Sequence, residues 1–466
     1  MSLTRYLDPY PMPMAPLLLG QISGGASAAF ALRLIRAWHL GPLARIRRSS
    51  DNAETMIGYA RGPRTTQNVH TNTALAGAVV GTPGTLPTGW QIFSNTTGCA
   101  LNVTATGTDP ATGYPSVVVQ LVGASTGGQL RLVISSPVAA AEGQRFCLSI
   151  GHRMTAGSLT NITSLQLVQR FRNITSGTLL STIQNFTPTS IQPLRVGVSG
   201  VGPVDTVQNT NEIVISTGAG AVDVTLRLIA PNIEIGPAIN ARTLLNNSVT
   251  TVTDAGGLDI DAVEAFIGSG GTAQVVTWFD QSGAAKDVTN ATAANQPFLA
   301  TTGCLETTQT GRPGVRFAGG SGSLRGASTV VAFQAHSVSN TSATTAGFEY
   351  MSGGGANGLF VDRKSSTQRR VGKFGVTVNS TTDSANGQTA VYTDIASGIR
   401  RNGTNLTMVS DSIGSESNVL EIGGRNSLSG FIGTIAELIL LPQETDAATR
   451  TLIEQNQGAY FGVAIA

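Results

Sequence analysis

The fold of this 466-residue chain is indicated by the stretch Trp278-Phe-Asp-Gln-Ser-Gly-Ala-Ala-Lys286. It ends a run of β-type residues, Ala273 to Trp278, with the polar turn Asp280-Gln-Ser-Gly283. Asp and Ser side chains bond to the backbone of their own turn, and Gly accepts the positive φ that such turns need. A similar stretch, Leu420-Glu-Ile-Gly-Gly-Arg-Asn426, precedes the apolar run from Gly430 to Leu441. Both stretches predict strands that end in glycine-rich turns.

Composition indicates a mainly β protein. The chain contains 56 Gly, and only 12% of its residues are charged, against about a quarter in a typical soluble domain. Its 29 Lys and Arg nearly balance its 27 Asp and Glu, which argues against a nucleic-acid partner or a polybasic membrane surface. Low charge also suits packing against other copies of the chain, because few charges need desolvation.

The N-terminal residues do not resemble a signal peptide. Asp8 and four prolines interrupt residues 1–20, so no apolar core of the usual length forms there. No run of about 20 apolar residues occurs anywhere in the chain, so no membrane insertion is predicted. Residues 1–24 are expected to form an arm that docks on a neighbour, because Tyr6, Tyr10 and several Met and Leu side chains are poorly placed in water.

Short apolar runs between turn-rich pieces predict an antiparallel sandwich from about residue 66 to about residue 240. The runs are Val117–Val122, Leu130–Ile134, Arg145–Ile150, Leu165–Val168 and Val222–Ile229. Gly123-Ala-Ser-Thr-Gly127 matches the pattern of a nucleophile elbow, but the elbow needs a helix after it. Strand-like runs flank it on both sides, so we expect a hairpin loop.

Three segments are predicted to be helical. Ala26–Trp38 carries large apolar residues at a spacing of four, which is typical of one face of a helix. Leu258–Ile267 has an Asp near its start, and Gly268 ends it. A closing helix is expected over Asp446–Asn456, with Thr445 as its candidate cap.

No metal or cofactor site is predicted from the cysteines and histidines. Cys99, Cys147 and Cys304 fit no zinc spacing, and an odd count is no disulfide framework. Cys99 and Cys147 can pair inside one sandwich, or all three can be buried thiols of a protein made in a reducing compartment. The four histidines are scattered, and no Gly-rich run is followed by the Gly-Lys-Ser/Thr of a phosphate-binding loop.

Five motifs in the outer parts of the chain, about residues 25–65 and 241–466, resemble the catalytic domain of α-L-arabinofuranosidase B of fungi and bacteria. In order, they are Arg45-Ile-Arg-Arg-Ser-Ser-Asp-Asn52, Leu258-Asp-Ile-Asp261, Thr277-Trp-Phe-Asp-Gln-Ser-Gly283, Gly311-Arg-Pro-Gly-Val-Arg-Phe317 and Ile422-Gly-Gly-Arg-Asn426. The resemblance implies a concanavalin-like β-sandwich of the lectin and glucanase kind. The same string of motifs is common in bacteriophage tail and appendage proteins.

The middle of the chain, residues 66–240, resembles a jelly roll of the carbohydrate-binding-module type, which also recurs in phage virion proteins. The motifs are Leu86-Pro-Thr-Gly-Trp90, Ala141-Glu-Gly-Gln-Arg-Phe146, Thr155-Ala-Gly-Ser-Leu-Thr-Asn161 and Thr225-Leu-Arg-Leu-Ile-Ala-Pro231. Motifs of the first family flank this module, so the resemblances imply a jelly roll inserted into a discontinuous sandwich at 25–65 and 241–466. A guest whose termini lie close together is tolerated at an exposed loop.

The resemblance stops short of catalysis. Glycoside hydrolysis normally needs two carboxylates. In α-L-arabinofuranosidase B the acid follows the Gly-Gly of the late motif, where this chain has Arg425. The nucleophile follows a Val-Asp pair, best matched here by Val361-Asp362, which Arg363 and Lys364 follow. A cation is no nucleophilic carboxylate, and Arg donates no proton near neutral pH, so the resemblance implies a protein that is no enzyme.

Other charged residues near the motifs have two interpretations each. Asp362, Glu421 and Glu437 can form a relocated catalytic pair or can be ordinary surface and turn carboxylates, and we favour the second. Arg369-Arg370 and Arg400-Arg401 can meet acidic polysaccharide or a neighbouring subunit, or can be solvated turn residues, which is again favoured.

Glycan contact is predicted at four residues. Tyr114 lies in a loop and is the aromatic ring chosen for stacking on a sugar. Asp280 can bind a sugar hydroxyl or Ca²⁺, or can hold its own turn, which is favoured; no specific calcium motif supports the ion. Asp362 and Arg425 complete the set because they fall at the positions of the family's active site.

We therefore predict a non-catalytic structural and adhesion component of a tailed bacteriophage particle, located on the virion as a tail fibre or a tail or head appendage. It would bind host surface polysaccharide through several weak sites that act together. The expected partners are further copies of the chain, and the family resemblance implies a trimer. Other virion proteins are expected to bind residues 1–24. Two alternatives stay open: a virion-associated glycoside hydrolase of the arabinofuranosidase type, and a capsid or tail decoration protein that binds no glycan.

Overall fold

The fold is taken from a computed structural model of the chain. Of the predicted docking arm at 1–24, only the last residues are described, and Leu18, Leu19 and Ile22 among them are buried. The structure describes residues 18–22, 24–36, 39, 41–60, 64–110, 114–135, 137–188, 194–235, 249–252, 257–268, 270–308, 311–320, 322–341, 347–352, 358–365, 368–373, 377–383, 389–395, 398–411, 419–424 and 430–466.

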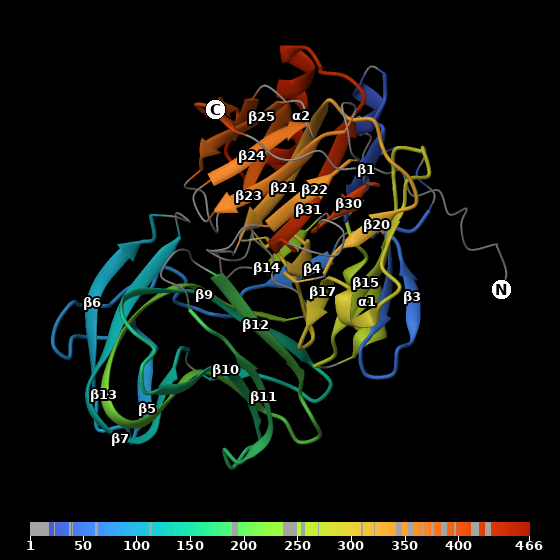
Figure 1. Cartoon of the computed structure of the whole chain (residues 1–466). Helices are drawn as coiled ribbons and strands as arrows, with labels where there is room; N and C mark the ends of the chain where they lie inside the picture. Colours follow the sequence, from blue (N-terminus) through green and yellow to red (C-terminus); the bar gives the residue numbers. More distant parts are fainter. Residues whose placement is uncertain are drawn as a thin grey trace.

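The outer parts of the chain form one closed array of antiparallel strands, called the main sandwich below (Figure 1). Its strands are β1 (Ala28–Ala31), β2 (Ala44–Arg48), β3 (Glu54–Ile57), β15 (Ala273–Trp278), β16 (Val288–Thr289), β17 (Phe298–Thr301), β18 (Cys304–Leu305), β19 (Val315–Ala318), β20 (Leu324–Gly326), β21 (Gln334–Thr341), β22 (Gly347–Met351), β23 (Phe360–Ser365), β24 (Gln368–Lys373), β25 (Thr377–Thr382), β26 (Ala390–Ile395), β27 (Gly398–Arg401), β28 (Thr404–Asn405), β29 (Val409–Asp411), β30 (Glu421–Ile422) and β31 (Ile432–Leu441).

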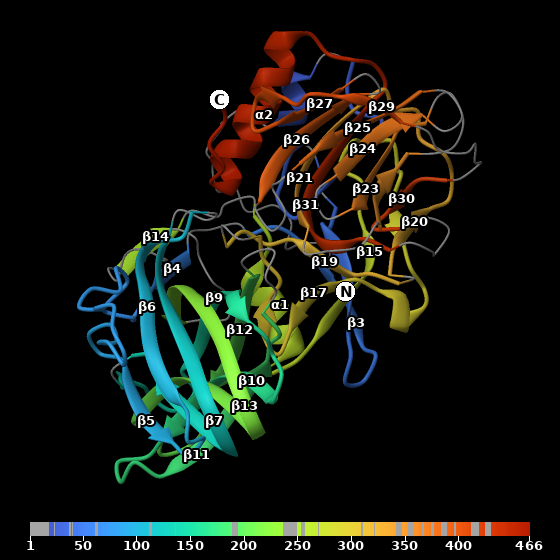
Figure 2. The ribbon, with the colours of Figure 1, turned by 60° about the vertical axis from the view of Figure 1, so that its left-hand side comes forward.

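Two layers of the main sandwich face each other. One layer runs β27-β26-β21-β31, and the other runs β30-β22-β23-β24-β25-β29. Strands β19, β17, β15, β16 and β20 connect the two layers by further hydrogen-bonded pairs. Helix α2 (Ala447–Phe461) lies against β26 and β21, on the side away from the second layer (Figure 2).

The middle of the chain forms a second system of nine strands, the inserted sandwich. Long strands β7 and β13 pair from Ser116↔Ile229 to Val133↔Glu212, and each crosses from one layer to the other. The first layer is β11-β10-β13-β7-β5, and the second is β12-β9-β13-β7-β6. Its strands are β5 (Gln91–Asn95), β6 (Ala100–Thr108), β7 (Pro115–Val133), β8 (Val138–Ala139), β9 (Arg145–Gly157), β10 (Ile162–Arg172), β11 (Thr178–Asn185), β12 (Leu194–Val201) and β13 (Gln208–Ile235).

The chain enters and leaves the inserted sandwich through two strands that lie side by side. Strand β4 (Arg64–Gln67) pairs with β14 (Val249–Val252), and Figures 1 and 2 show this pair at the junction of the two sandwiches. Adjacent entry and exit strands are the condition that an inserted module requires. The predicted boundary near residue 65 falls within β4, and the one near residue 240 falls within 236–248, outside the described residues, so the domain boundaries stay a prediction.

The two sandwiches also contact each other through side chains. The Sγ atoms of Cys147 on β9 and Cys304 on β18 lie 2.9 Å apart. Arg145 at the start of β9 forms an ion pair with Glu264 of helix α1 (Ile260–Ile267). Cys147 therefore faces the main sandwich and not Cys99, and all three cysteines are buried thiols, as in the second of the two sequence interpretations.

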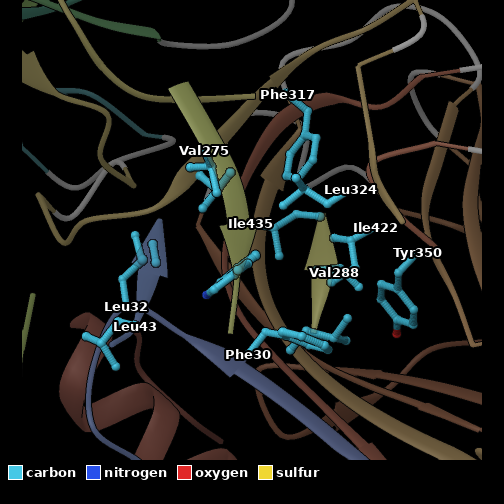
Figure 3. Close-up of a cluster of buried hydrophobic side chains, with 14 of the residues drawn as sticks. Phe30, Leu32, Leu43, Val275, Val288, Phe317, Leu324, Tyr350, Ile422 and Ile435 are labelled. Carbon is cyan, nitrogen blue, oxygen red and sulfur yellow. The ribbon is translucent and has the colours of Figure 1, made fainter. Parts of the chain in front are cut away.

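The stretch from Trp278 to Lys286 holds β1 onto the main sandwich. The Gln281 amide nitrogen donates to the carbonyls of Ala31 (3.0 Å) and Arg33 (2.8 Å), and its oxygen accepts the N–H of Ile35 (3.0 Å). Phe30 on β1 then packs 5.9 Å from the Trp278 ring, between ring centroids. Figure 3 shows Phe30 converging with side chains from β15, β16 and β31 in the main core.

The mainly β sandwich fold with few helices is confirmed, but the helix predicted over 26–38 is wrong, because β1 is a strand paired with β31. Phe30 faces the main core, while Ala29 and Ala31 pack against Leu18 and other residues on the opposite side. In a strand that is buried on both faces, apolar and polar residues no longer alternate. The spacing of four residues between Phe30 and a later large apolar residue then looked like one face of a helix.

Three smaller expectations also need correction. Gly123–Gly127 is no hairpin loop but lies inside β7, where positive φ values at Gly123 and Gly127 accompany the passage between layers. The closing helix is longer than predicted, and its cap is Asp446, whose side chain accepts the N–H of Thr449 at 2.7 Å. Helix α1 ends before Gly268 as predicted, but it begins at Ile260, two residues after the predicted Leu258, with Asp259 as its N-cap. No helix among the described residues has the length and apolar character that crossing a bilayer requires.

We predict that Gln281→Ala lowers the free energy of unfolding of the main sandwich by about 3 kcal/mol, because buried carbonyls at Ala31 and Arg33 and the Ile35 N–H lose their partner. Urea titration followed by tryptophan fluorescence measures this change. The control is Gln443→Ala at an exposed position. Its free energy of unfolding is expected to lie within about 0.5 kcal/mol of that of the parent. A decrease in the free energy of unfolding of less than about 1 kcal/mol would show that the Gln281 hydrogen bonds do not hold β1 in place.

Candidate functional site

The outer face of β22–β25 and β29 carries the residues that the sequence placed nearest an active site. Alternation along β23 points Asp362 and Lys364 outward and Arg363 inward. Asp362 lies opposite Arg370 of β24 and is held by two bonds, Nε to Oδ1 at 2.9 Å and Nη2 to Oδ2 at 2.5 Å. Lys364 Nζ lies 2.8 Å from Asp411 Oδ2 on β29. Two ion pairs therefore lie side by side on this face.

The two ion pairs differ in exposure. Asp362 is 2% exposed, beside the apolar side chains of Phe348 and Phe360 on the same face. Burial raises the pKa of Asp362, and the Arg370 guanidinium only partly opposes the rise. The Lys364 side chain is 44% exposed, so a ligand reaches the Lys364–Asp411 pair and not Asp362 itself. The accessible part of the face is the end that Lys364 occupies.

The second predicted catalytic position, Arg425, lies outside the described residues. The Gly-Gly before it is described. Gly423 has φ +83°, and a Cβ there would overlap the ring of Phe317, so only glycine fits this turn. The turn therefore requires glycine at position 423 for steric reasons, whether or not the motif has a catalytic role.

The carboxylates considered for a relocated pair do not gather at one place. Glu421 on β30 is buried and accepts the Ser323 hydroxyl at 2.7 Å. Glu437 on β31 points to the α2 side of the other layer, where Arg33 holds it with bonds of 2.6 and 3.0 Å. Because Asp362 faces away from the opposite layer, Glu437 and Asp362 lie on different outer faces of the main sandwich. Asp362 and Glu437, both described, therefore do not form the relocated catalytic pair.

Between the layers lies a buried ionic network centred on Arg369 of β24. Its guanidinium binds Glu349 of β22 and donates to Asp394 of β26, at 2.9 Å from Nη2 to Oδ2. The Tyr350 hydroxyl donates to the same Asp394 oxygen at 2.6 Å, and the guanidinium stacks on the ring of Tyr392 at 3.8 Å. Burial raises the pKa of Tyr350. Arg369 thus joins both layers of the sandwich.

A second arginine extends the network. Arg363 Nη1 lies 2.8 Å from Asp383 Oδ2, and Arg401 Nη1 donates to Asp383 Oδ1 at 2.7 Å. The Tyr392 hydroxyl donates to Asp383 at 2.8 Å. The expectation that Arg369-Arg370 is a solvated turn pair is wrong, because these residues alternate on a strand, one into the network and one onto the outer face.

Tyr114 and Asp280 lie away from this face. Tyr114 is partly buried and packs against Cys147 and Cys304 where the two sandwiches meet. Asp280 is 7% exposed, and its oxygens accept from the backbone of Ala29 and Lys286 and from both groups of Ser282. The structure thus brings Asp362 and Lys364 together and separates Tyr114 and Asp280 from them, and the glycan and Ca²⁺ roles stay predictions. Among the described residues, no three His, Cys, Asp or Glu side chains form a metal-binding group.

Sequence reasoning missed Arg370 and Asp411 as members of this face. Part of the signal lies in the opposite charges of Asp362 and Arg370, which stand opposite each other once β23 and β24 pair. No local pattern links Asp411 to Lys364, since β29 joins the sheet through β25.

Comparison with known proteins gives partial structural similarity. The sequence matches no protein-family model, and no curated protein is significantly similar. Tailspike protein 4 of bacteriophage CBA120, in its enzymatically active domain, is 12% identical over 31% of this chain and 19% of that chain, with TM-score 0.24. An arabinose-bound α-L-arabinofuranosidase is 16% identical over 43% and 29%, with TM-score 0.28. The chain thus spans less than a third of either structure. A xylan-binding domain from Paenibacillus barcinonensis is 13% identical over 38% and 97%, with TM-score 0.24.

We predict that Asp383 makes the main sandwich acid-sensitive. Burial alone would raise the pKa of Asp383, but the Arg363 guanidinium and the Tyr392 hydroxyl bring it down to about 2. A folded-state pKa below the usual value stabilises the fold above about pH 4, and this stabilisation is lost as the pH falls toward 2. Its size is on the order of 2 kcal/mol.

The measurement is thermal or urea unfolding between pH 2 and pH 7. Asp383→Asn is expected to be less stable than the parent at pH 7 and to have a flatter dependence below pH 4, because the titrating group is gone. Glu444→Gln, at an exposed position of the same sandwich, is the control and should follow the parent. Parallel curves for the parent and the Asp383 variant would exclude this assignment.

Proposed function

We propose that this chain binds glycan without cleaving it, as a structural and adhesion component of a bacteriophage particle. The observation that supports the absence of cleavage is the pairing of the outer-face carboxylates. Asp362 is engaged by both nitrogens of an arginine fork, and Asp411 by the Lys364 ammonium. The virion location and the assembly of several copies rest on the resemblance of the sequence motifs to those of phage tail and appendage proteins.

Paired carboxylates are poorly suited to glycoside hydrolysis. The reaction needs one carboxylic acid that gives its proton to the leaving oxygen and one free carboxylate that acts as nucleophile or base. Two N–H groups of the Arg370 guanidinium occupy both oxygens of Asp362, so neither oxygen is turned toward a sugar. Asp362 is also too buried for a substrate to reach it.

The exposed end of the face suits sugar binding instead. The Lys364 ammonium donates and the Asp411 carboxylate accepts, which is the pair of functions that two neighbouring sugar hydroxyls require. Val409, 65% exposed on the same strand as Asp411, offers an apolar surface next to these polar groups. Their mutual ion pair holds both groups in place before the ligand arrives, which lowers the entropy lost on binding. A site of this size binds weakly, so adhesion requires several copies acting together.

We predict that the double variant Lys364→Ala, Asp411→Ala weakens binding to the recognised glycan by roughly tenfold or more, because both polar partners of the sugar are removed. A glycan array identifies the ligand, and titration calorimetry on the purified oligosaccharide measures the affinity. Removing both partners leaves no unpaired charge, so the fold is expected to persist.

Lys286→Ala is the matched control, since Lys286 is another lysine of the main sandwich that reaches solvent and has one hydroxyl partner, Ser328. Its affinity should equal that of the parent. Release of reducing ends from the bound glycan would instead establish a glycoside hydrolase. A parent protein that binds nothing on a broad array would favour a decoration protein.

A further inference from the structure

A second charged cluster lies on the inserted sandwich, on the outer face of the layer β11-β10-β13-β7-β5. Its centre is Glu212 of β13, whose neighbour Ile213 points into the core of the inserted sandwich. Arg131 of β7 and Arg170 and Arg172 of β10 surround it on the same face. Three arginines around one glutamate leave this cluster with a net charge of +2.

Glu212 is fully buried beneath the arginines that bind it. Arg131 forms a fork with it, Nε to Oε2 at 2.9 Å and Nη2 to Oε1 at 2.7 Å. Arg170 Nε donates to Oε1 at 3.1 Å, and Arg172 Nη2 lies 3.7 Å from the same oxygen. One carboxylate therefore fixes the positions of three cations.

Two of the arginines are also held by neighbouring groups, and all three nitrogens of Arg172 are engaged, since its Nη1 donates to the carbonyl of Ser176 at 2.8 Å. Arg170 Nη1 donates to the Ser181 hydroxyl at 2.8 Å, and Arg172 Nε donates to Thr210 at 3.0 Å. Among the described residues, Nη1 of Arg131 and Nη2 of Arg170 make no hydrogen bond, and both side chains are 21% exposed. These nitrogens are oriented donors at the surface of the cluster.

The cluster also holds more positive charge than its surroundings neutralise. Burial lowers the pKa of Arg172, and the nearby Arg170 and Arg131 lower it further against the opposing effect of Glu212. An added anion relieves this repulsion, which is the electrostatic condition for an anion-binding site.

An apolar shelf adjoins the arginines. Phe93 on β5 is 54% exposed, and the Arg131 guanidinium stacks on one side of it, 4.4 Å from the ring centroid. Ile183 on β11 is 47% exposed and lies in the same row of the sheet as Glu212, through the pairs Ile183↔Val168↔Glu212. The face thus combines fixed guanidinium donors with exposed apolar surface, as the carboxylate and the C–H face of an acidic sugar require.

We propose that this face of the inserted sandwich is a binding site for an acidic polysaccharide whose sugar rings carry carboxylates. The carboxylate would accept from the free nitrogens of Arg131 and Arg170, and the sugar ring would lie on Phe93. A planar carboxylate matches the spacing of guanidinium donors better than a hydroxyl does. The inference goes beyond the proposed function, because it assigns a separate site and a ligand class to the inserted sandwich.

The test is titration calorimetry of the full chain with galacturonate oligomers, using the methyl-esterified oligomer as the uncharged ligand of the same ring shape. Arg170→Gln is the main variant, because Arg131 still holds Glu212 and the fold is retained. We expect binding of the acid form only, weakened roughly tenfold or more by Arg170→Gln and by Phe93→Ala. Arg170→Lys should lose most of this affinity too, since an ammonium has no fork.

Two controls distinguish binding at this cluster from binding elsewhere on the chain. Arg47→Gln removes an arginine of the main sandwich that is paired with Glu54, and it should leave the affinity unchanged. The Lys364→Ala, Asp411→Ala variant should also bind the acidic oligomer as the parent does, even if the main-sandwich proposal fails. Loss of binding in that double variant, equal binding of the methyl ester, or full affinity in Arg170→Gln would each overturn the proposal. Two results together would overturn the carboxylate selectivity: dextran sulfate binding as tightly as galacturonate, and Arg170→Lys keeping the full affinity of the parent. Binding would then depend on charge attraction alone.

Discussion

A charge that leaves water must meet an opposite charge or a hydrogen-bond donor, and this constraint organises the whole chain. Charged residues are scarce, yet many carboxylates are buried beside an arginine or a hydroxyl from another strand or helix. Arg33 binds Glu437 and Asn456, which joins the segment after β1 to β31 and α2. Arg369 joins three strands of two layers. The buried carboxylates with such partners include Glu212, Glu349, Asp362, Asp383, Asp394, Glu421, Glu437 and Glu454.

The same constraint limits the chemistry available at the surface. Asp362 and Glu437 each fix an arginine, so both have a structural role within the fold. The groups that the two proposed sites use are the Lys364 ammonium with its partner Asp411, and the fork nitrogens of Arg131 and Arg170 that make no hydrogen bond among the described residues. Donors of this kind bind hydroxyl and carboxylate oxygens without reacting with them. The proposed function and the second site both follow from this division.

Sequence patterns predicted what depends on neighbouring residues and missed what depends on distant strands. The turn at Asp280 and the caps of α1 are local, and each was predicted from its own residues. Strand β1 resembled part of a helix because it is buried on both faces, and its partner β31 lies about 400 residues further along the chain, where no local pattern shows it. For the same reason no spacing could join Lys364 to Asp411, or Arg131 to Arg170 and Glu212, which meet only after three strands pair. The contact between Cys147 and Cys304 belongs to this class as well, since it forms only when the two sandwiches meet.

Scarcity of charge also makes the remaining clusters act separately. At physiological ionic strength, charges further apart than about 8 Å are largely screened from one another. The cluster around Glu212 lies on the inserted sandwich and the pair of Lys364 and Asp411 on the main sandwich, so they are two separate contacts. Two independent contacts on one chain gain affinity only when both reach the same polymer, because the second contact then forms within the complex. A long polysaccharide meets that condition and a short oligosaccharide does not. If both proposed sites bind sugar, a polymeric ligand that reaches both gains more affinity than a small one.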